Sequence, residues 1–270
     1  MGKIPAESVD TDDSLFWLVK EKIHLIVPFG MHYTKGKDMQ ATLVVKNLSK
    51  IYTCNPAGTQ ISNGFIACYH DQIVAAGPGD GSKYIDPELT RVIDGTGCIA
   101  VPAFIEPRYT NRFEMEYQLR EDLTRRFYNG ILTFVTDDRH LCRTDLLWKV
   151  VYRKEAADQP VYSLKENALE ADSLLSTMHS QWKITSFQPL LLEAAHGLKA
   201  DSADLLMQIT RIPAQRLHLE KDGQIKKGMN ASFLLIYGNS FDDYIFTVGS
   251  NPIERIVHKG IPVWPAVIRC

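Results

Sequence analysis

The chain has 270 residues, of which 45% are hydrophobic, and this is enough to bury at least one sizeable core. Its net charge of -2 and pI of about 6.4 give no basic footprint, so no nucleic-acid partner is expected. No apolar run approaches the roughly 20 residues that span a bilayer, so no membrane association is expected either.

The cysteine pattern and the first residues indicate a cytoplasmic protein. The chain has an odd number of cysteines and no C-x-x-C, which is typical of a reducing compartment rather than of a disulfide framework; they are Cys54, Cys68, Cys98, Cys142 and Cys270. The sequence also begins with an acidic stretch, whereas a secretion signal would be basic and then apolar.

Residues 1–40 are predicted to form a helix followed by a loop. Ser14 is placed to cap a helix that runs to about Ile26, with apolar side chains at helical spacing on one face. We expect this face to make a core or dimer contact, because its polar side lacks the Lys and Arg enrichment of a membrane anchor.

Short runs rich in β-branched and aromatic residues occupy residues 41–105, separated by turn formers, and they predict strands joined by hairpins. The end of the chain has the same texture. Four runs there predict short strands, namely ASFLLIYG, DYIFTVG (243–249), PIERIVHKG and IPVWPAV.

The residues between these strand-rich segments are mainly helical in pattern. A helix is expected to end at Gly130, followed by a buried strand over 131–137. Four further helices are predicted at 146–157, 163–182, 186–198 and 201–217, the last capped by Asp201 or Ser202.

The order of strands, helices and strands predicts an α+β fold with strands from both ends of the chain in one composite β-sandwich. The expected organisation is an N-terminal helix and loop at 1–40, a β-sandwich of 41–105 plus 218–270, and a mainly helical insertion at 106–217.

Three segments, at residues 64–77, 92–107 and 209–233, carry motifs of a known family. They resemble the amidohydrolase superfamily, nearest in style to its imidazolonepropionase and dihydroorotase-like branches. Residues 64–77 are similar to the family's "G-x-I … D/G-x-I-x-x-x-G" hairpin, and residues 92–107 to "V-I-D-A-x-G-x-x-V-x-P-G-F-I-D". Residues 210–217 and 221–233 are similar to "T-x-N-P-A-x-x-L" and "x-x-G-x-I-x-x-G-x-x-A-D-L". The matches cover roughly half of the chain, and they imply a composite β-sandwich with a metal-dependent TIM barrel inserted in it.

The family's metal-binding motif is replaced in this chain. In the family the first barrel strand ends in His-x-His, and residues two apart on a strand face the same side, so both imidazoles reach one ion. Here Arg108 and Thr110 occupy these positions, and an arginine has no lone pair to donate and repels a cation. Glu106 stands where the family has Asp, and Ser232 replaces the Asp of its "A-D" pair.

The insertion is also short for a barrel, because a TIM barrel takes about 200 residues or more. Only about 110 residues separate Pro107 from Leu217. The eight histidines lie far apart, with no H-x-H or H-x-x-x-H; they are His24, His32, His70, His140, His179, His196, His218 and His258. We therefore expect most of the barrel to be missing, with no metal ligands and no catalytic residues.

Two other groups of polar residues have a functional and a structural interpretation. Asp137 and His140, with Cys142, follow a predicted strand, and they form either a remnant ligand site or a polar loop in which Asp138 caps the next helix. The basic pairs Arg125-Arg126 and Lys226-Lys227 are interpreted as solvated faces.

Three functional hypotheses follow. The first is a non-catalytic amidohydrolase-like protein, free of cofactors, that acts through a second copy of itself or through an intact paralogous enzyme. The second is a hydrolase acting on the C–N bond of a cyclic amide or amidine, with a rebuilt site that holds zinc. The third is a binding module for a small anionic ligand, with Arg108 as the anion hook. The candidate ligand-binding residues are Arg108, Thr110, Glu106, Asp137 and His140.

Overall fold

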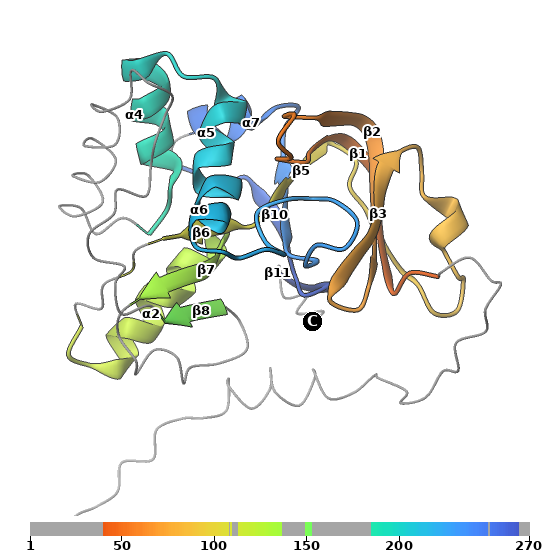
Figure 1. The fold of residues 1–270 in the computed structure, drawn as a ribbon, viewed down its shortest axis with the longest axis horizontal. Helices are drawn as coiled ribbons and strands as arrows, with labels where there is room; N and C mark the ends of the chain where they lie inside the picture. Colours follow the sequence, from red (N-terminus) through yellow and green to blue (C-terminus); the bar gives the residue numbers. More distant parts are fainter. Residues whose placement is uncertain are drawn as a thin grey trace, which may run out of the picture. The chain divides into compact units, whose positions relative to one another are not determined.

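The computed structural model describes residues 40–107, 109, 113–136, 149–152, 185–247 and 249–264. These residues form a mixed α and β fold with one sheet of eight strands, a second sheet of three strands and a few helices (Figure 1). Most of the predicted N-terminal segment, and the helix predicted over 163–182, lie outside the described residues.

The strands predicted between residues 41 and 105 are confirmed. In chain order they are β1 (Leu43–Tyr52), β2 (Gln60–Tyr69), β3 (Gln72–Pro78), β4 (Arg91–Asp94) and β5 (Cys98–Pro102), with a short 3-10 helix η1 (Ser82–Tyr84) after β3. The turn between β4 and β5 is closed by Asp94, whose carboxylate accepts hydrogen bonds from the backbone N–H and the hydroxyl of Thr96. Short Asp side chains favour turns through such contacts.

Strands from the end of the chain complete the same sheet. They are β9 (Phe233–Tyr237), β10 (Ile253–His258) and β11 (Ile261–Trp264), and the order across the sheet is β11-β10-β9-β5-β1-β2-β3, with β4 also paired to β1. The two halves meet where β5 and β9 pair antiparallel. An isolated bridge between Gln72 and Asn230 also joins the start of β3 to the segment that leads into β9. Strands from residues 43–102 and 233–264 therefore build one sheet, whereas the composite β-sandwich stays a prediction.

Alternation along β9 places its side chains in two different cores. Phe233 and Leu235 pack with the apolar residues of β1 and β2, whereas Leu234 and Ile236 pack with the helices and with β6 and β7. Successive side chains of a strand point to opposite faces, so one fully apolar strand serves both cores. This explains why the run FLLIY carries no charged residue.

A smaller parallel sheet follows directly after β5. It consists of β6 (Phe104–Glu106), β7 (Ile131–Thr136) and β8 (Lys149–Tyr152), in the order β6-β7-β8. Helix α2 (Glu116–Tyr128) connects β6 to β7 and is followed by Gly130, which has a φ of 83°. A side chain at Gly130 would overlap Leu234 of β9, so the turn also requires the close approach that glycine allows.

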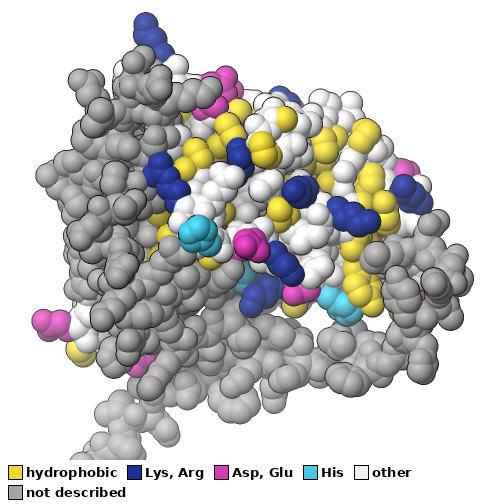
Figure 2. All heavy atoms as spheres, in the orientation of Figure 1, with side chains coloured by type: hydrophobic (Ala, Val, Ile, Leu, Met, Phe, Trp, Pro, Cys, Tyr) yellow, Lys and Arg dark blue, Asp and Glu magenta, His cyan; other side chains and the backbone are white. Residues whose placement is uncertain are grey.

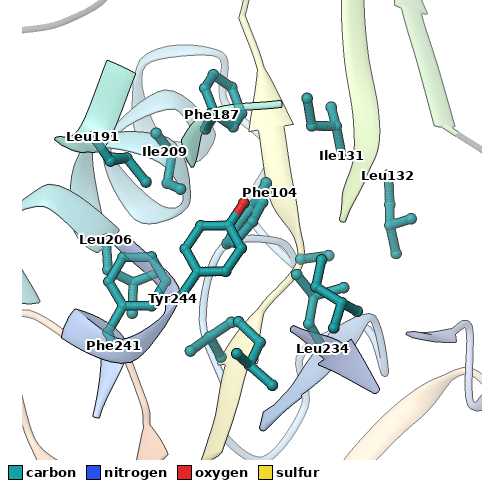
Figure 3. Packing of buried hydrophobic residues seen from close by; sticks show 14 of the residues in the cluster. Phe104, Ile131, Leu132, Phe187, Leu191, Leu206, Ile209, Leu234, Phe241 and Tyr244 are labelled. Atoms are coloured by element: carbon teal, nitrogen blue, oxygen red, sulfur yellow. The ribbon is translucent and has the colours of Figure 1, made fainter. Parts of the chain in front are cut away.

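The remaining helices cover the core between the two sheets. They are α4 (Gln188–Leu198), α5 (Ser202–Ile209), α6 (Arg211–Arg216) and α7 (Phe241–Phe246). Figure 3 shows Phe104 of β6 near Phe187, Phe241 and Tyr244, and the Phe104 ring centroid lies 5.6 Å from that of Tyr244 and 6.1 Å from that of Phe187. Asp201, one of the two caps predicted, caps α5 through the backbone N–H of Ala203. The single helix predicted over 201–217 is instead two helices, α5 and α6.

The strand predicted over residues 243–249 is wrong, because the chain forms α7 there. Ser240 and Asp243 make a capping box, in which each side chain accepts from the backbone N–H of the other residue. Asp243 Oδ2 also accepts from the N–H of Asn239 at 2.6 Å. The spacing S-x-x-D is a helix-start signal that the aromatic, β-like texture concealed.

The helix predicted over residues 146–157 is also wrong at its centre, where Lys149–Tyr152 forms β8. This segment contains two consecutive valines and a tyrosine, which favour extended backbone. Pairing with β7 in a parallel ladder then outweighs the helical spacing of the surrounding residues. Among its described residues, the region 106–217 thus holds two parallel strands, β7 and β8, and the last residue of β6.

Candidate functional site

The candidate site lies at the carboxyl ends of β6 and β7, the edge at which α/β folds place their ligands. Glu106 is the last residue of β6, and Thr136 is the last residue of β7. Both are polar, and both are 1% exposed. Two buried polar side chains at the ends of neighbouring parallel strands make this edge the strongest candidate among the described residues.

A buried arginine from α2 joins this edge to the helix. Arg126 Nη1 donates to Glu106 Oε2 at 2.5 Å, and Arg126 Nε donates to Asp122 Oδ2 at 2.8 Å. The side chains of Glu106 and Arg126 are 1% and 10% exposed, so the contact is shielded from water. One guanidinium therefore holds two carboxylates that come from two different elements.

Tyr109 completes the cluster from the segment that follows β6. Its hydroxyl donates to Asp122 Oδ2 at 3.0 Å, and its ring centroid lies 5.0 Å from Arg126 Cζ. Its backbone N–H donates to Val135 O at 2.7 Å, which extends the contact of this segment with β7. Tyr109 is thus fixed by a hydrogen bond, a cation–π contact and a backbone contact.

The protonation states of the cluster follow from these contacts. Burial raises the pKa of the Tyr109 phenol, and the nearby carboxylate of Asp122 raises it further, so the phenol stays protonated and donates. Burial by itself lowers the pKa of Arg126, but Glu106 and Asp122 outweigh this effect, and the pKa is raised overall. The guanidinium is therefore charged at neutral pH.

The helical period explains why α2 supplies two members of the cluster. Its buried residues are Asp122, Leu123, Arg126 and Phe127, which recur at the spacing of one helix face. Arg125 points away and pairs with the exposed Glu121, with side chains 64% and 58% exposed. The solvated face predicted for Arg125-Arg126 is therefore correct for Arg125 and wrong for Arg126.

Of the five residues proposed from the sequence, only Glu106 lies among the described residues. Arg108, Thr110, Asp137 and His140 lie outside them. Sequence reasoning missed Tyr109, Asp122 and Arg126. A usable signal was present, since an acid and a base four residues apart on a helix face can pair, but the sequence does not show that this face is buried.

A serine–histidine contact elsewhere resembles a nucleophile and its base. Ser232 Oγ lies 3.1 Å from His258 Nδ1, and the backbone N–H of Lys259 donates to the same hydroxyl at 3.2 Å. In serine hydrolases the hydroxyl faces Nε2 and a carboxylate holds Nδ1, so the ring here is turned the other way. We interpret the contact as structural, because it joins the residue before β9 to the end of β10 and to the turn that follows it.

The described cysteines do not form a reactive site. Cys54, Cys68 and Cys98 are free and buried. Burial raises the pKa of Cys54 to about 12, although a hydrogen bond with Thr210 opposes the shift, and burial raises that of Cys68 to about 12 as well. A thiol with such a pKa is a weak nucleophile and a weak metal ligand at neutral pH.

Charge on the described surface and the length of the described helices can be compared with the composition. On the face drawn in Figure 2, Lys and Arg side chains are spread among hydrophobic and neutral ones, and acidic side chains occur between them. Within the described ranges, every helix is too short or too polar to cross a membrane. The same ranges contain no group of three or more His, Cys, Asp or Glu side chains placed to hold a metal ion.

Comparison with known proteins identifies the fold but no family by sequence. No protein-family model matches the chain, and no curated protein matches it. Among solved structures, an adenosine deaminase from Xanthomonas campestris with bound zinc is similar with a TM-score of 0.54 at 9% identity, over 83% of this chain and 93% of the other.

Two further structures give the same result. A triazine hydrolase variant matches with a TM-score of 0.52 at 12% identity, over 82% of this chain and 94% of the other. The atrazine chlorohydrolase TrzN from Arthrobacter aurescens, complexed with zinc, matches with a TM-score of 0.51 at 13% identity and the same coverage. These neighbours are amidohydrolase-family enzymes, so the chain has an amidohydrolase-like fold.

The described residues at the candidate edge do not fit a metal ion. Glu106 is the last residue of β6, and its carboxylate already binds the guanidinium of Arg126. A divalent ion at the same carboxylate would meet that positive charge at contact distance, which is strongly unfavourable in a buried site. The described part of this edge therefore supports no chemical step that passes through a metal.

Proposed function

We propose that this chain is a metal-independent, non-catalytic amidohydrolase-like protein that acts by binding a ligand or a partner. In this proposal residues 41–105 and 218–270 form the composite β-sandwich, residues 106–217 are a shortened barrel, and residues 1–40 are a separate N-terminal segment. The observation that carries the proposal is the ion pair between Glu106 and Arg126 at the end of β6.

Two residue identities support the same proposal. Arg108 and Thr110 stand where the superfamily has its two histidines, and neither offers the imidazole nitrogen that zinc requires. The sequence and the Glu106–Arg126 pair thus both support the proposal that side chains, rather than an ion, supply positive charge at this edge. Function belongs to the site and not to the fold, so the likeness to enzymes does not argue against this proposal.

The proposed ligand is a small anion, and the proposed partner is a second copy of the chain or an intact paralogous enzyme, in the cytoplasm. Arg108 is the residue expected to bind the anion, because a guanidinium makes paired hydrogen bonds with a carboxylate or phosphate. Thr110, Asp137 and His140 are proposed to line the same site, next to Glu106.

Metal analysis by mass spectrometry tests the proposal directly. We expect the purified chain to contain far less than one zinc, iron or manganese per molecule, before and after supplementation of the growth medium. The double variant Arg108→His and Thr110→His is the matched control, since it restores the His-x-His spacing and shows whether a gain of metal is detectable. About one metal per wild-type chain would refute the proposal.

Anion binding is tested by thermal shift with inorganic phosphate and with small dicarboxylates. A ligand that binds only the folded state raises Tm as its concentration exceeds its Kd. We expect a saturable rise for the wild type and none for Arg108→Gln, with the exposed Arg125→Gln as the charge-matched control. An equal rise in all three proteins would show that the anion acts on the whole surface and not at this site.

One observation favours a second candidate function, a zinc-dependent hydrolase of a cyclic amide or amidine with a rebuilt site. Two of the similar structures are described with zinc. This candidate predicts turnover that is lost with a chelator and recovered with zinc. Absence of turnover in a protein supplemented with zinc, iron and manganese would dismiss it.

A further inference from the structure

We propose that Arg126 is a resident cation, a side chain that permanently fills the position of a positive ion between two buried carboxylates. The guanidinium contacts Glu106 Oε2 from β6 and Asp122 Oδ2 from α2. It therefore connects the end of a strand with the helix that packs on it, as a bound ion connects ligands from separate elements.

The surrounding atoms are those of a cation site. Two carboxylates bring oxygen atoms to the guanidinium, and oxygen ligands of this kind suit hard cations. The Tyr109 hydroxyl donates to one of these carboxylates, that of Asp122. A buried carboxylate without a cation is costly, so the pair of acids requires a positive charge between them. Arg126 supplies this charge without an ion from solution.

Other ion pairs on the same helix show what is particular about Arg126. Arg120–Glu116 and Arg125–Glu121 are also pairs at i,i+4, but their four side chains are all more than half exposed and belong to α2 alone. Such pairs contribute little. Arg126, by contrast, forms an ion pair with a residue of a second element, which makes Arg125 the natural control.

The consequence is a positioning role. Through Asp122 the guanidinium holds the Tyr109 hydroxyl, and through the ring face it holds the Tyr109 side chain. Tyr109 lies three residues after the end of β6, so its side chain is positioned without a metal. This positioning role rests on the proposed metal-independent function, because a metal at this edge would compete with Arg126 for Glu106.

The main test removes the guanidinium of Arg126 by substitution and then supplies a cation in solution. Arg126→Ala in the full chain is expected to lower Tm by roughly 10 °C, since two buried carboxylates lose the cation between them. Guanidinium at low millimolar concentration, or Mn²⁺, should restore part of this loss in a saturable manner. Neither should raise the Tm of the wild type or of Arg125→Ala. A residue that only fills space would not be replaced by a soluble cation.

Two more variants keep the test decisive if Arg126→Ala does not fold. Arg126→Lys retains a charge, whereas Arg126→Met retains bulk without a charge. A resident cation predicts that the lysine variant keeps more of the wild-type Tm than the methionine variant. The triple variant with Glu106→Gln, Asp122→Asn and Arg126→Met removes all three charges, and it should be more stable than Arg126→Met alone.

The outcomes separate this inference from the proposed function. If Arg126→Met is as stable as the wild type, or if no cation restores Arg126→Ala, Arg126 is a packing residue and the inference fails. Stoichiometric metal in the wild-type protein would instead overturn the proposed function, whatever the Arg126 variants show.

Discussion

The eight-stranded sheet and the contact between α2 and the end of β6 are held together by different forces. Strand β9 lies inside the sheet between β10 and β5, and its side chains there are apolar. The buried ones are Phe233, Leu234, Leu235 and Ile236. Where α2 meets β6, the centre of the contact is an arginine between two acids. Apolar burial has no preferred partner, but a buried charge requires one partner at one position.

The two interfaces should therefore tolerate amino-acid substitutions to different degrees. A sheet with an apolar core accepts other apolar side chains of similar volume, at a cost of usually less than about 1.5 kcal/mol. The α2–β6 contact is less tolerant, because removing the charge of Arg126, Glu106 or Asp122 leaves an opposite charge buried without its partner. Substitutions that remove one contact at a time should therefore separate the two kinds of interface.

The largest effect is expected in the sheet. Phe233→Ala removes a fully buried ring from the core that β9 shares with β1, and it should lower the free energy of unfolding by about 3–5 kcal/mol. Tyr237→Ala on the same strand is the control, because this side chain is 64% exposed and should cost less than about 1 kcal/mol. Urea denaturation followed by circular dichroism measures both. Similar losses for the two variants would mean that the strand, and not the buried ring, sets the stability.

The junction between the two regions is expected to be nearly as sensitive. Gly130→Ala should cost about 2–4 kcal/mol, because alanine is strained at a φ of 83° and its Cβ would overlap Leu234. Gly58→Ala is the matched control, since Gly58 has a φ of 63° with open space around it and carries only the backbone cost of about 1 kcal/mol. The difference in stability between the two variants measures the effect of the close approach between β9 and the turn that joins α2 to β7. Equal losses would show that the two regions are less tightly packed at this point.

A smaller effect is expected at α7, on the helical side of the core. Ser240→Ala removes half of the capping box and should cost about 1 kcal/mol. Asp242→Asn changes an acid in the same first turn that takes no part in the box, and it should cost clearly less. Thermal unfolding of the two variants measures the difference. If both variants match the wild type, packing of Phe241 and Tyr244 alone holds this helix.

These elements also show how far the sequence could predict the structure. The strands at both ends were predictable because alternating and β-branched runs lie between clear turn residues. Helix α7 was mistaken for a strand, because a six-residue helix is too short to show its period and its aromatic residues favour strands. Only the cap spacing of Ser240 and Asp243 carried the correct signal.

The candidate site was less predictable than the fold. Glu106 could be proposed because it falls at the end of a motif that resembles a known family. Arg126 could not, because its charge predicts exposure, and burial became evident only when α2 was seen to pack on β6. Tyr109 lies between the two positions that carried the argument, and its role depends on a helix residue 13 positions away.

The smallest expected effect concerns pH and a turn of the sheet. Hydrogen bonds from the Thr96 side chain, the Asn47 side chain and the Thr96 backbone lower the pKa of Asp94 below its ordinary value. A carboxyl whose pKa is lower in the folded state stabilises the fold above its unfolded pKa of about 3.9, and this contribution is lost as the pH falls through the folded pKa. Because Asp94 is exposed, the change in stability with pH should be slight, unlike a loss at the buried Glu106–Arg126 pair.

Denaturation of the wild type and of Asp94→Asn between pH 7 and pH 3 measures this change in stability. The wild type should be more stable at neutral pH, and the two curves should converge in acid. A constant gap over this range would mean that Asp94 acts through the shape of its turn and not through its charge.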